Sequence, residues 1–300
     1  MDEFIIIFNG EETRVDKFLV TQLPDLTRTQ IQIMIKNGQV LVNEEQVKPN
    51  YILKQDDEIL IEFVEPNDST IQAEDIKLDV VYEDEDVIVV NKPSGMVVHP
   101  APGNYSGTLV NALLFHCHDL SGINGEIRAG IVHRIDKDTS GLLVACKNDL
   151  AHKNLSKQFA EKTVTRKYYA ICNGVIPHNI GKVTAPIGRD PINRQQMAVV
   201  DGGKDAVTHF RVLDRLKKHT LIECILETGR THQIRVHMKY IGFPVSGDPL
   251  YGPKGDVAKY GQYLHAKTLG FTHPRTNQFM EFDSELPSYF EEFLNELRNE

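Results

Sequence analysis

A short polar segment at residues 65–70 divides the sequence into two parts with different hydrophobic patterns. The part before it has a helical pattern that ends at Gly38 and short apolar runs that predict hairpin strands. The part after residue 76 is dominated by strand-like runs, at 80–82, 87–90, 142–146, 168–172, 206–213 and 221–227, and has a helical stripe that Asp149 can cap. Neighbouring strands with few helices between them favour an α+β fold. We predict a small domain at 13–70 and, at 76–300, a larger domain on a mixed, largely antiparallel sheet.

The charge of the chain is strongly segregated. The net charge is −9, yet residues 128–240 contain 20 Lys and Arg against 10 Asp and Glu, a local charge of +10. A basic segment of this kind attracts polyanions, whereas an acidic remainder limits indiscriminate binding. The composition is therefore compatible with a nucleic-acid partner.

The sequence has no pattern typical of export, membrane insertion or metal binding. Its four cysteines form no C-x-x-C pair, and the N-terminus lacks a basic region before its short apolar run. The apolar runs are shorter than the roughly 18 residues that a membrane-spanning helix needs. The local cluster at residues 116–118, His-Cys-His, lacks a second ligand pair at the spacing of a zinc site. We expect a cytoplasmic monomer with reduced thiols, no bound metal and no membrane partner.

A charged turn lies between two apolar runs in the segment GIVHRIDKDTSGLLVAC, at residues 130–146. It places Asp136 at a strand end beside Arg134 and Lys137, and nearby cations favour the ionised carboxylate. Asp136 is therefore a candidate nucleophile or orienting anion. Asp138 is an alternative, but a hydrogen bond to its own turn is the simpler interpretation of that residue.

A second polar cluster, LETGRTHQIRVHM, occupies residues 226–238. Thr231 can cap the helix predicted there, so Arg230 precedes a helix N-terminus and suits either a phosphate or a protein carboxylate. Arg235 and Lys239 lie off the apolar stripe of this helix and could follow a nucleic-acid backbone. His232 and His237 are five residues apart, not the four of a helical metal pair, and are expected to form hydrogen bonds.

Five motifs occur in a set order along the chain. They are HRIDKDTSGLL, RKYYA (166–170), LETGRTHQIRVHM, GFPVSGDPLYG (242–252) and LHAKTLGFTHP (264–274). Together they resemble the RluA family of RNA pseudouridine synthases. The residues RVDKFLV and the segment from LTRTQIQIMIKNGQVLVN to DDEILIEF resemble an S4 domain, a small RNA-binding fold.

The resemblance implies that the protein isomerises uridine to pseudouridine in RNA without a cofactor. It assigns the nucleophile to Asp136, stacking on uracil and proton removal from C5 to Tyr168, and pairing with Asp136 to Arg230. Tyr169 should lie on the opposite strand face and pack. A stem-loop of large-subunit (23S) ribosomal RNA is the expected target, with tRNA as the alternative. The candidate RNA contacts are Arg14, Lys17, Arg28 and Lys36 in the S4-like part, and Arg134, Lys137, Arg166, Arg235 and Lys239 in the larger domain.

Two other functions fit parts of this pattern. A glycosidase or nucleoside hydrolase would also act at an anomeric carbon, but such enzymes need two working carboxylates, and Asp138 is doubtful as the second. A non-catalytic RNA-binding or ribosome-assembly factor would need neither Asp136 nor Tyr168.

Overall fold

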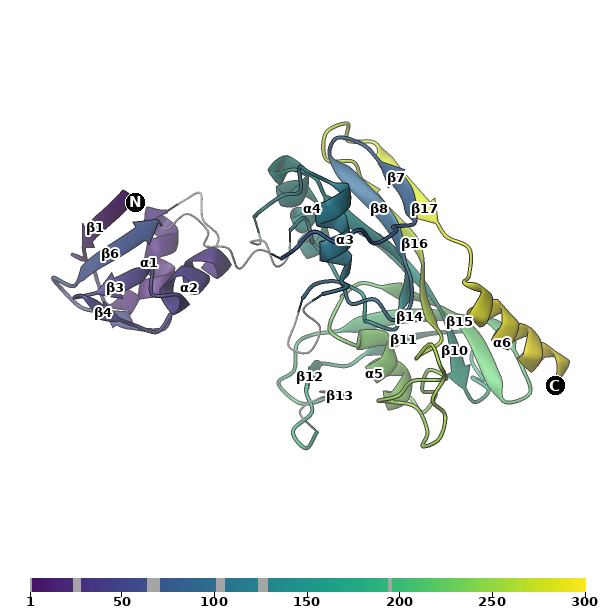
Figure 1. Cartoon of the computed structure of the whole chain (residues 1–300). Coiled ribbons are helices and arrows are strands. Elements are labelled where there is room, and N and C mark those ends of the chain that lie inside the picture. The colour runs from purple at the N-terminus through teal and green to yellow at the C-terminus, as the bar shows by residue number, and fades with distance from the viewer. Residues whose placement is uncertain (1, 24–27, 64–70, 101–105, 124–128, 194–195) are drawn as a thin grey trace. The chain divides into compact units, whose positions relative to one another are not determined.

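The computed structural model describes residues 2–23, 28–63, 71–100, 106–123, 129–193 and 196–300. The chain divides into two compact units, one at Met1–Ile71 and one that contains Gln72–Ser121 and Ala129–Glu300 (Figure 1). The polar segment at 65–70 lies outside the described residues.

The first unit is a small α+β unit. Its main sheet has the antiparallel order β1-β6-β3-β4, and a second pair of strands, β2 and β5, lies beside helices α1 and α2. The bounds are β1 Asp2–Ile7, β2 Thr13–Arg14, α1 Val15–Gln22, α2 Arg28–Lys36, β3 Val40–Val42, β4 Glu45–Gln46, β5 Ile52–Leu53 and β6 Glu58–Phe63. Leu19 and Ile35 from the helices pack against Val40 and Ile59 from the sheet in one core. Gly38 ends α2 at φ 77°, as predicted.

The second unit is built on one large mixed sheet. Within the described residues, the sheet has nine strands. Eight of them follow the order β11-β14-β15-β10-β16-β9-β8-β7, and the ninth, β17, pairs with Thr268–Thr272 of β16 (Figure 1). The bounds are β7 Val80–Glu83, β8 Val87–Lys92, β9 Ser140–Cys146, β10 Thr165–Asn173, β11 Ile180–Thr184, β14 Val207–Arg215, β15 His219–Leu226, β16 Leu264–Thr272 and β17 Phe279–Asp283. The β16–β9 pair is parallel, and the other strand pairs described in this sheet are antiparallel. The predicted α+β class and largely antiparallel sheet are confirmed.

In the part of the chain that the structure describes, this unit also contains four helices and a hairpin. They are α3 Leu109–His116, α4 Asp149–Glu161, α5 Gln233–Tyr240, α6 Ser288–Asn299, and the hairpin of β12 Ile187–Arg189 and β13 Met197–Val199. Leu155 of α4 shares a core with strands β8, β9 and β16. Asn148, not Asp149, caps α4, because its side chain accepts a hydrogen bond from the Ala151 N–H at 2.9 Å. Among the described helices, none has the length and apolar character needed to cross a bilayer.

Candidate active site

A pocket of about 260 Å³ opens beside the turn that precedes β9. Its walls come from the loop after β8, from that turn, from the first residues of α5, and from two segments between α5 and β16. The lining residues are Val97, Val98, His99, Arg134, Ile135, Asp136, Lys137, Asp138, His232, Arg235, Pro249, Leu250 and Gln262. The fold thus brings the two polar clusters of the sequence, almost one hundred residues apart, to one cavity.

Arg235 bridges two carboxylates at the wall of this pocket. Its Nη1 atom donates to Asp136 Oδ2 at 2.9 Å, while Nε and Nη2 donate to the two oxygens of Asp248 at 2.7 and 2.8 Å. Asp136 retains 16% side-chain exposure, whereas Arg235 and Asp248 are buried. Burial acts to lower the pKa of Arg235, but the hydrogen bonds and charges of Asp248 and Asp136 outweigh it and raise that pKa. Asp136 is the one carboxylate of this pair that lines the pocket, and the buried Arg235 guanidinium is hydrogen-bonded to it.

The prediction that Arg230 pairs with Asp136 is wrong. Arg230 is exposed, and its Nε atom donates to the backbone oxygen of Asp205 at 2.9 Å. The helix begins at Gln233, and residue 232, not Thr231, is its N-cap, so Arg230 lies in the preceding loop. Arg235 lies on the helix itself, where residues 233–238 are all buried. The expectation that Arg235 follows an RNA backbone is also wrong, because its guanidinium is buried and donates its hydrogen bonds to two carboxylates.

Tyr168 lies on the buried face of β10. Residues 166, 168 and 170 are buried, and the alternate residues are partly exposed, as expected for a strand with side chains on two faces. Burial raises the pKa of Tyr168, the charge of Arg166 lowers it, and the charge of Asp136 raises it, so these groups are electrostatic neighbours. Tyr169 packs on the other face against the core around Phe290, as predicted. Tyr168 is not one of the residues that line the pocket, but it interacts electrostatically with Asp136.

His232 is a site residue whose partners the sequence did not reveal. Its Nδ1 atom lies 2.8 Å from the Tyr251 hydroxyl, which also accepts the backbone N–H of Met197 at 2.8 Å. Its Nε2 atom lies 3.9 Å from Asp136 Oδ1. Burial lowers the pKa of His232 despite the nearby Asp136, so the ring is a neutral hydrogen-bonding group. The expectation that His232 and His237 form hydrogen bonds is confirmed, since His237 contacts Thr208 and Ala185.

Lys92 joins two loops that line the pocket. Its Nζ atom donates to the backbone oxygens of Pro93, Met96 and Lys137 at 2.8, 2.8 and 2.9 Å. Burial lowers the pKa of this buried lysine to about 7, against the charges of Asp138 and Asp136, which raise it. Lys92 therefore fixes the backbone next to Asp136. The only signal in the sequence is a lysine at the end of an apolar strand, before Pro93.

Several predicted RNA contacts are exposed around the same site. Arg134 and Lys137 are exposed and line the pocket, and Lys239 is exposed at the end of α5. Arg166, in contrast, is buried. Exposed cations beside the pocket are suitably placed for phosphates of a bound polyanion.

The predicted RNA contacts of the first unit fall into two groups. Lys17 and Lys36 are exposed. Arg14 and Arg28 both donate to the fully buried Asp16, each with a shortest bond of 2.9 Å. Burial raises the pKa of Asp16, but hydrogen bonds from Arg14, from a nearby glutamine and from Arg28 outweigh it and lower that pKa to about 2. One carboxylate thus partly neutralises two of the four predicted contacts.

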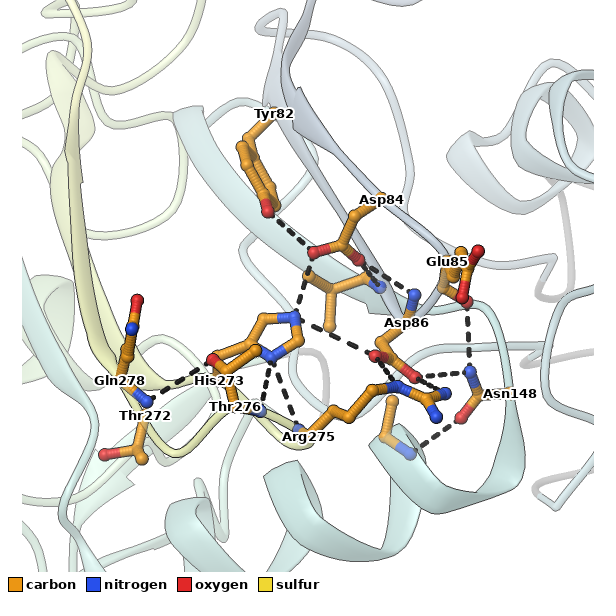
Figure 2. A network of polar contacts seen from close by, with 12 residues as sticks. Tyr82, Asp84, Glu85, Asp86, Asn148, Thr272, His273, Arg275, Thr276 and Gln278 are labelled. Carbon is orange, nitrogen blue, oxygen red and sulfur yellow. Dashed lines mark hydrogen bonds and ion pairs between the residues drawn. The ribbon is translucent and has the colours of Figure 1, made fainter.

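Asp84, Asp86 and His273 form one of two clusters of potential metal ligands among the described residues. Figure 2 shows that the cluster is filled by protein groups. Arg275 donates to both oxygens of Asp86 at 2.7 Å, and its guanidinium lowers the pKa of Asp86 to about 2. His273 contacts Asp84 through Nε2 at 2.9 Å and accepts backbone N–H groups at Nδ1. Arg275 therefore supplies the positive charge that these carboxylates require.

The second cluster contains Glu83, His116 and Cys117, two of which the sequence had singled out. Lys147 donates to Glu83 at 2.8 Å, and His116 Nε2 lies 2.7 Å from the same carboxylate. Burial raises the pKa of Cys117 to about 11, which disfavours the thiolate that metals bind. This donor set suits a surface ion pair better than a metal.

Comparisons with known proteins extend over nearly the whole chain. Residues 86–240 match the model of the RNA pseudouridylate synthase family, and residues 13–59 match that of the S4 domain. An RNA pseudouridine synthase of Bacillus subtilis, YlyB, is 57% identical over 95% of this chain and 94% of its own length. The ribosomal large subunit pseudouridine synthase D of Zymomonas mobilis is 48% identical over 91% and 90%. That of Neisseria meningitidis serogroup A is 47% identical over 96% and 79%. The structure of human RNA pseudouridylate synthase domain containing 1 has the same fold, with a TM-score of 0.59 and 24% identity over 78% of this chain and 98% of that one.

Proposed function

Because the chain belongs to the RNA pseudouridylate synthase family, we propose that it converts uridine to pseudouridine in large-subunit (23S) ribosomal RNA, with Asp136 as the nucleophile. Two relatives carry a name that specifies the ribosomal large subunit, and this supports ribosomal RNA over tRNA. The S4 domain, proposed to span 13–70, adds a second RNA-binding part to the catalytic domain at 76–300. The protein would act as a cytoplasmic monomer.

The observation that carries the proposal is the Asp136 carboxylate at the pocket wall, 2.9 Å from the Arg235 guanidinium. A carboxylate held in place by a fixed guanidinium can attack a carbon atom of the bound nucleotide. The N1–C1′ bond of uridine breaks, the base turns, and a C5–C1′ bond forms. The carboxylate leaves the carbon atom that it attacked, and C5 loses a proton while N1 gains one. Uridine and pseudouridine are isomers, so the reaction requires no redox cofactor.

The neighbouring residues take roles that follow from their positions. The target uridine must leave its stack to reach Asp136, at a cost of a few kcal/mol. Tyr168, which lies on β10 and interacts electrostatically with Asp136, is proposed to stack on the uracil and to take part in proton removal from C5. Arg235 takes the pairing role that the family resemblance assigned to Arg230. Arg134, Lys137 and Lys239 are proposed to contact phosphates.

The test compares Asp136→Asn with Asp138→Asn, since both side chains line the pocket and differ only in position. Each purified full-length variant is incubated with 23S ribosomal RNA and with tRNA transcripts carrying tritium at uridine C5. Tritium release measures loss of the C5 proton, and mass spectrometry of the digested RNA identifies pseudouridine. We expect Asp136→Asn to lower the rate by about 10⁴-fold or more and Asp138→Asn to keep it within about tenfold of the wild-type rate.

Each alternative function gives a distinct product. Free uracil and abasic RNA would indicate a hydrolase, and tight RNA binding without any product would indicate an assembly factor. Modification of tRNA alone would move the target from ribosomal RNA. Full pseudouridine formation by Asp136→Asn would remove the catalytic assignment.

A further inference from the structure

The buried guanidinium of Arg166 has no counter-charge among the described residues. The residue is 8% exposed, its Nε atom is fully buried, and none of the residues described accepts a hydrogen bond from that atom. Arg235 provides a direct comparison, because it is buried to 4% exposure and donates three hydrogen bonds to two carboxylates. Buried charges in proteins are normally paired, since an unpaired one loses its hydration without compensation.

The surroundings of Arg166 do not neutralise it. The Phe159 ring centroid lies 5.5 Å from the guanidinium carbon. His133 stacks on Phe159 at 4.6 Å and accepts the Val144 backbone N–H at 3.1 Å. Burial, together with the charge of Arg166, lowers the pKa of His133 to about 3, so the histidine is neutral. The contacts around Arg166 are therefore aromatic and uncharged.

Gly229 leaves room for this guanidinium next to the molecular surface. A Cβ atom at residue 229 would lie 2.6 Å from Arg166 Nη1, although Gly229 itself is exposed. Gly229 is not among the glycines with positive φ, so close approach of the arginine, not backbone conformation, accounts for a glycine here. One end of Arg166 thus reaches the exposed loop that leads to Arg230 and α5.

Arg166 also lies next to the proposed active site. It is two residues from Tyr168 on the same face of β10, and Tyr168 interacts electrostatically with both Arg166 and Asp136. A strand rises about 3.3 Å per residue, so the two side chains start about 7 Å apart. This separation is close to the spacing between a base and the phosphates of its own nucleotide.

We propose that Arg166 binds a backbone phosphate of the substrate RNA, next to the uridine that enters the pocket. The inference rests on the proposed function. Guanidinium groups bind phosphate through two parallel hydrogen bonds, which a lysine ammonium cannot form. The phosphate supplies the counter-charge that the free protein lacks, and the rigid strand holds the arginine in place before RNA arrives.

The test measures RNA binding by the full-length protein with Arg166→Met and Arg166→Lys. The probe is a stem-loop of 23S ribosomal RNA, and Kd is measured between 50 and 300 mM KCl. We expect Arg166→Met to weaken binding by roughly 10- to 100-fold and to reduce the slope of log K against log salt by about 0.7 to 0.9. Arg166→Lys should restore the slope and part of the affinity. Arg298→Met is the control, because Arg298 is exposed and already paired with Asp214.

Stability of the free variants separates phosphate binding from a structural role. Removing an unpaired buried cation should leave the thermal unfolding midpoint unchanged or raise it. Gly229→Ala should weaken RNA binding as well, because its methyl group displaces the guanidinium. A lower midpoint for Arg166→Met, or an unchanged Kd and salt slope, would overturn the inference. The wild-type modification assay tests the proposed function separately, so either proposal can fail while the other stands.

Discussion

Replacing Arg235 with lysine tests whether Arg235 or Arg230 is the arginine that pairs with Asp136. Arg235 makes one hydrogen bond to Asp136 and two to Asp248, all between 2.7 and 2.9 Å. A lysine has a single nitrogen on a stem without the planar fork, so it can approach one carboxylate but cannot bridge both. The substitution keeps the positive charge and removes the geometry.

The expected loss follows from the number and burial of these bonds. Hydrogen bonds to charged groups contribute about 1.5 to 3 kcal/mol each. Arg235→Lys loses two of the three, which gives about 3 to 6 kcal/mol of destabilisation. It leaves one carboxylate underpaired, either the fully buried Asp248 or Asp136 at 16% exposure. If the lysine stays with the buried Asp248, the Asp136 carboxylate loses its fixed donor. The rate should then fall by about 10² to 10³.

The same substitution at Arg230 is the matched control. Arg230 is exposed and donates from Nε to a backbone oxygen, so Arg230→Lys should change stability by less than about 0.5 kcal/mol. The assays are equilibrium urea unfolding and the single-turnover rate of pseudouridine formation at saturating RNA. A rate loss at Arg230 without one at Arg235 would refute the assignment, as would full stability and activity of Arg235→Lys.

Three further changes have defined outcomes. Gly141 has φ 113°, and a Cβ there would lie 2.3 Å from the Ala266 backbone, so Gly141→Ala should cost about 3 kcal/mol or more in urea unfolding. Asp16 has a folded pKa of about 2, below its unfolded value. The wild type should therefore be about 2 kcal/mol more stable to unfolding than Asp16→Asn above pH 5, and this difference should disappear as the pH falls through 2. Tyr251→Phe removes the acceptor of the Met197 N–H, so hydrogen exchange of that amide should accelerate.

Six strands of the large sheet and the two faces of β10 could be predicted from the sequence because periodicity reports burial directly, whereas β11, β16 and β17 were not predicted. The predicted run at 168–172 lies inside β10, and the assignment of Tyr168 and Tyr169 to opposite faces follows from alternation alone. The burial of helix α5 was harder to predict. Its apolar stripe identified one buried face, but the polar face with Arg235 is buried too, against Asp136 and Asp248. Hydrophobic patterns cannot reveal a buried face made of paired charges, because its residues have the composition of a solvated one.

Two buried arginines, Arg235 and Arg166, have different electrostatic roles, since Arg235 pairs with Asp136 and Arg166 is proposed to bind a phosphate. Arg235 donates its hydrogen bonds to Asp136 and Asp248, so it can hold Asp136 in position but has little capacity left to bind RNA. A carboxylate placed beside Arg166 would satisfy that guanidinium and would also repel a phosphate at the position where the nucleotide must enter. Stability of the free protein and attraction of the substrate therefore make opposite demands on the charges near Tyr168. A cation paired with Asp136, and an unpaired cation at Arg166 that is proposed to bind a phosphate, meet both demands.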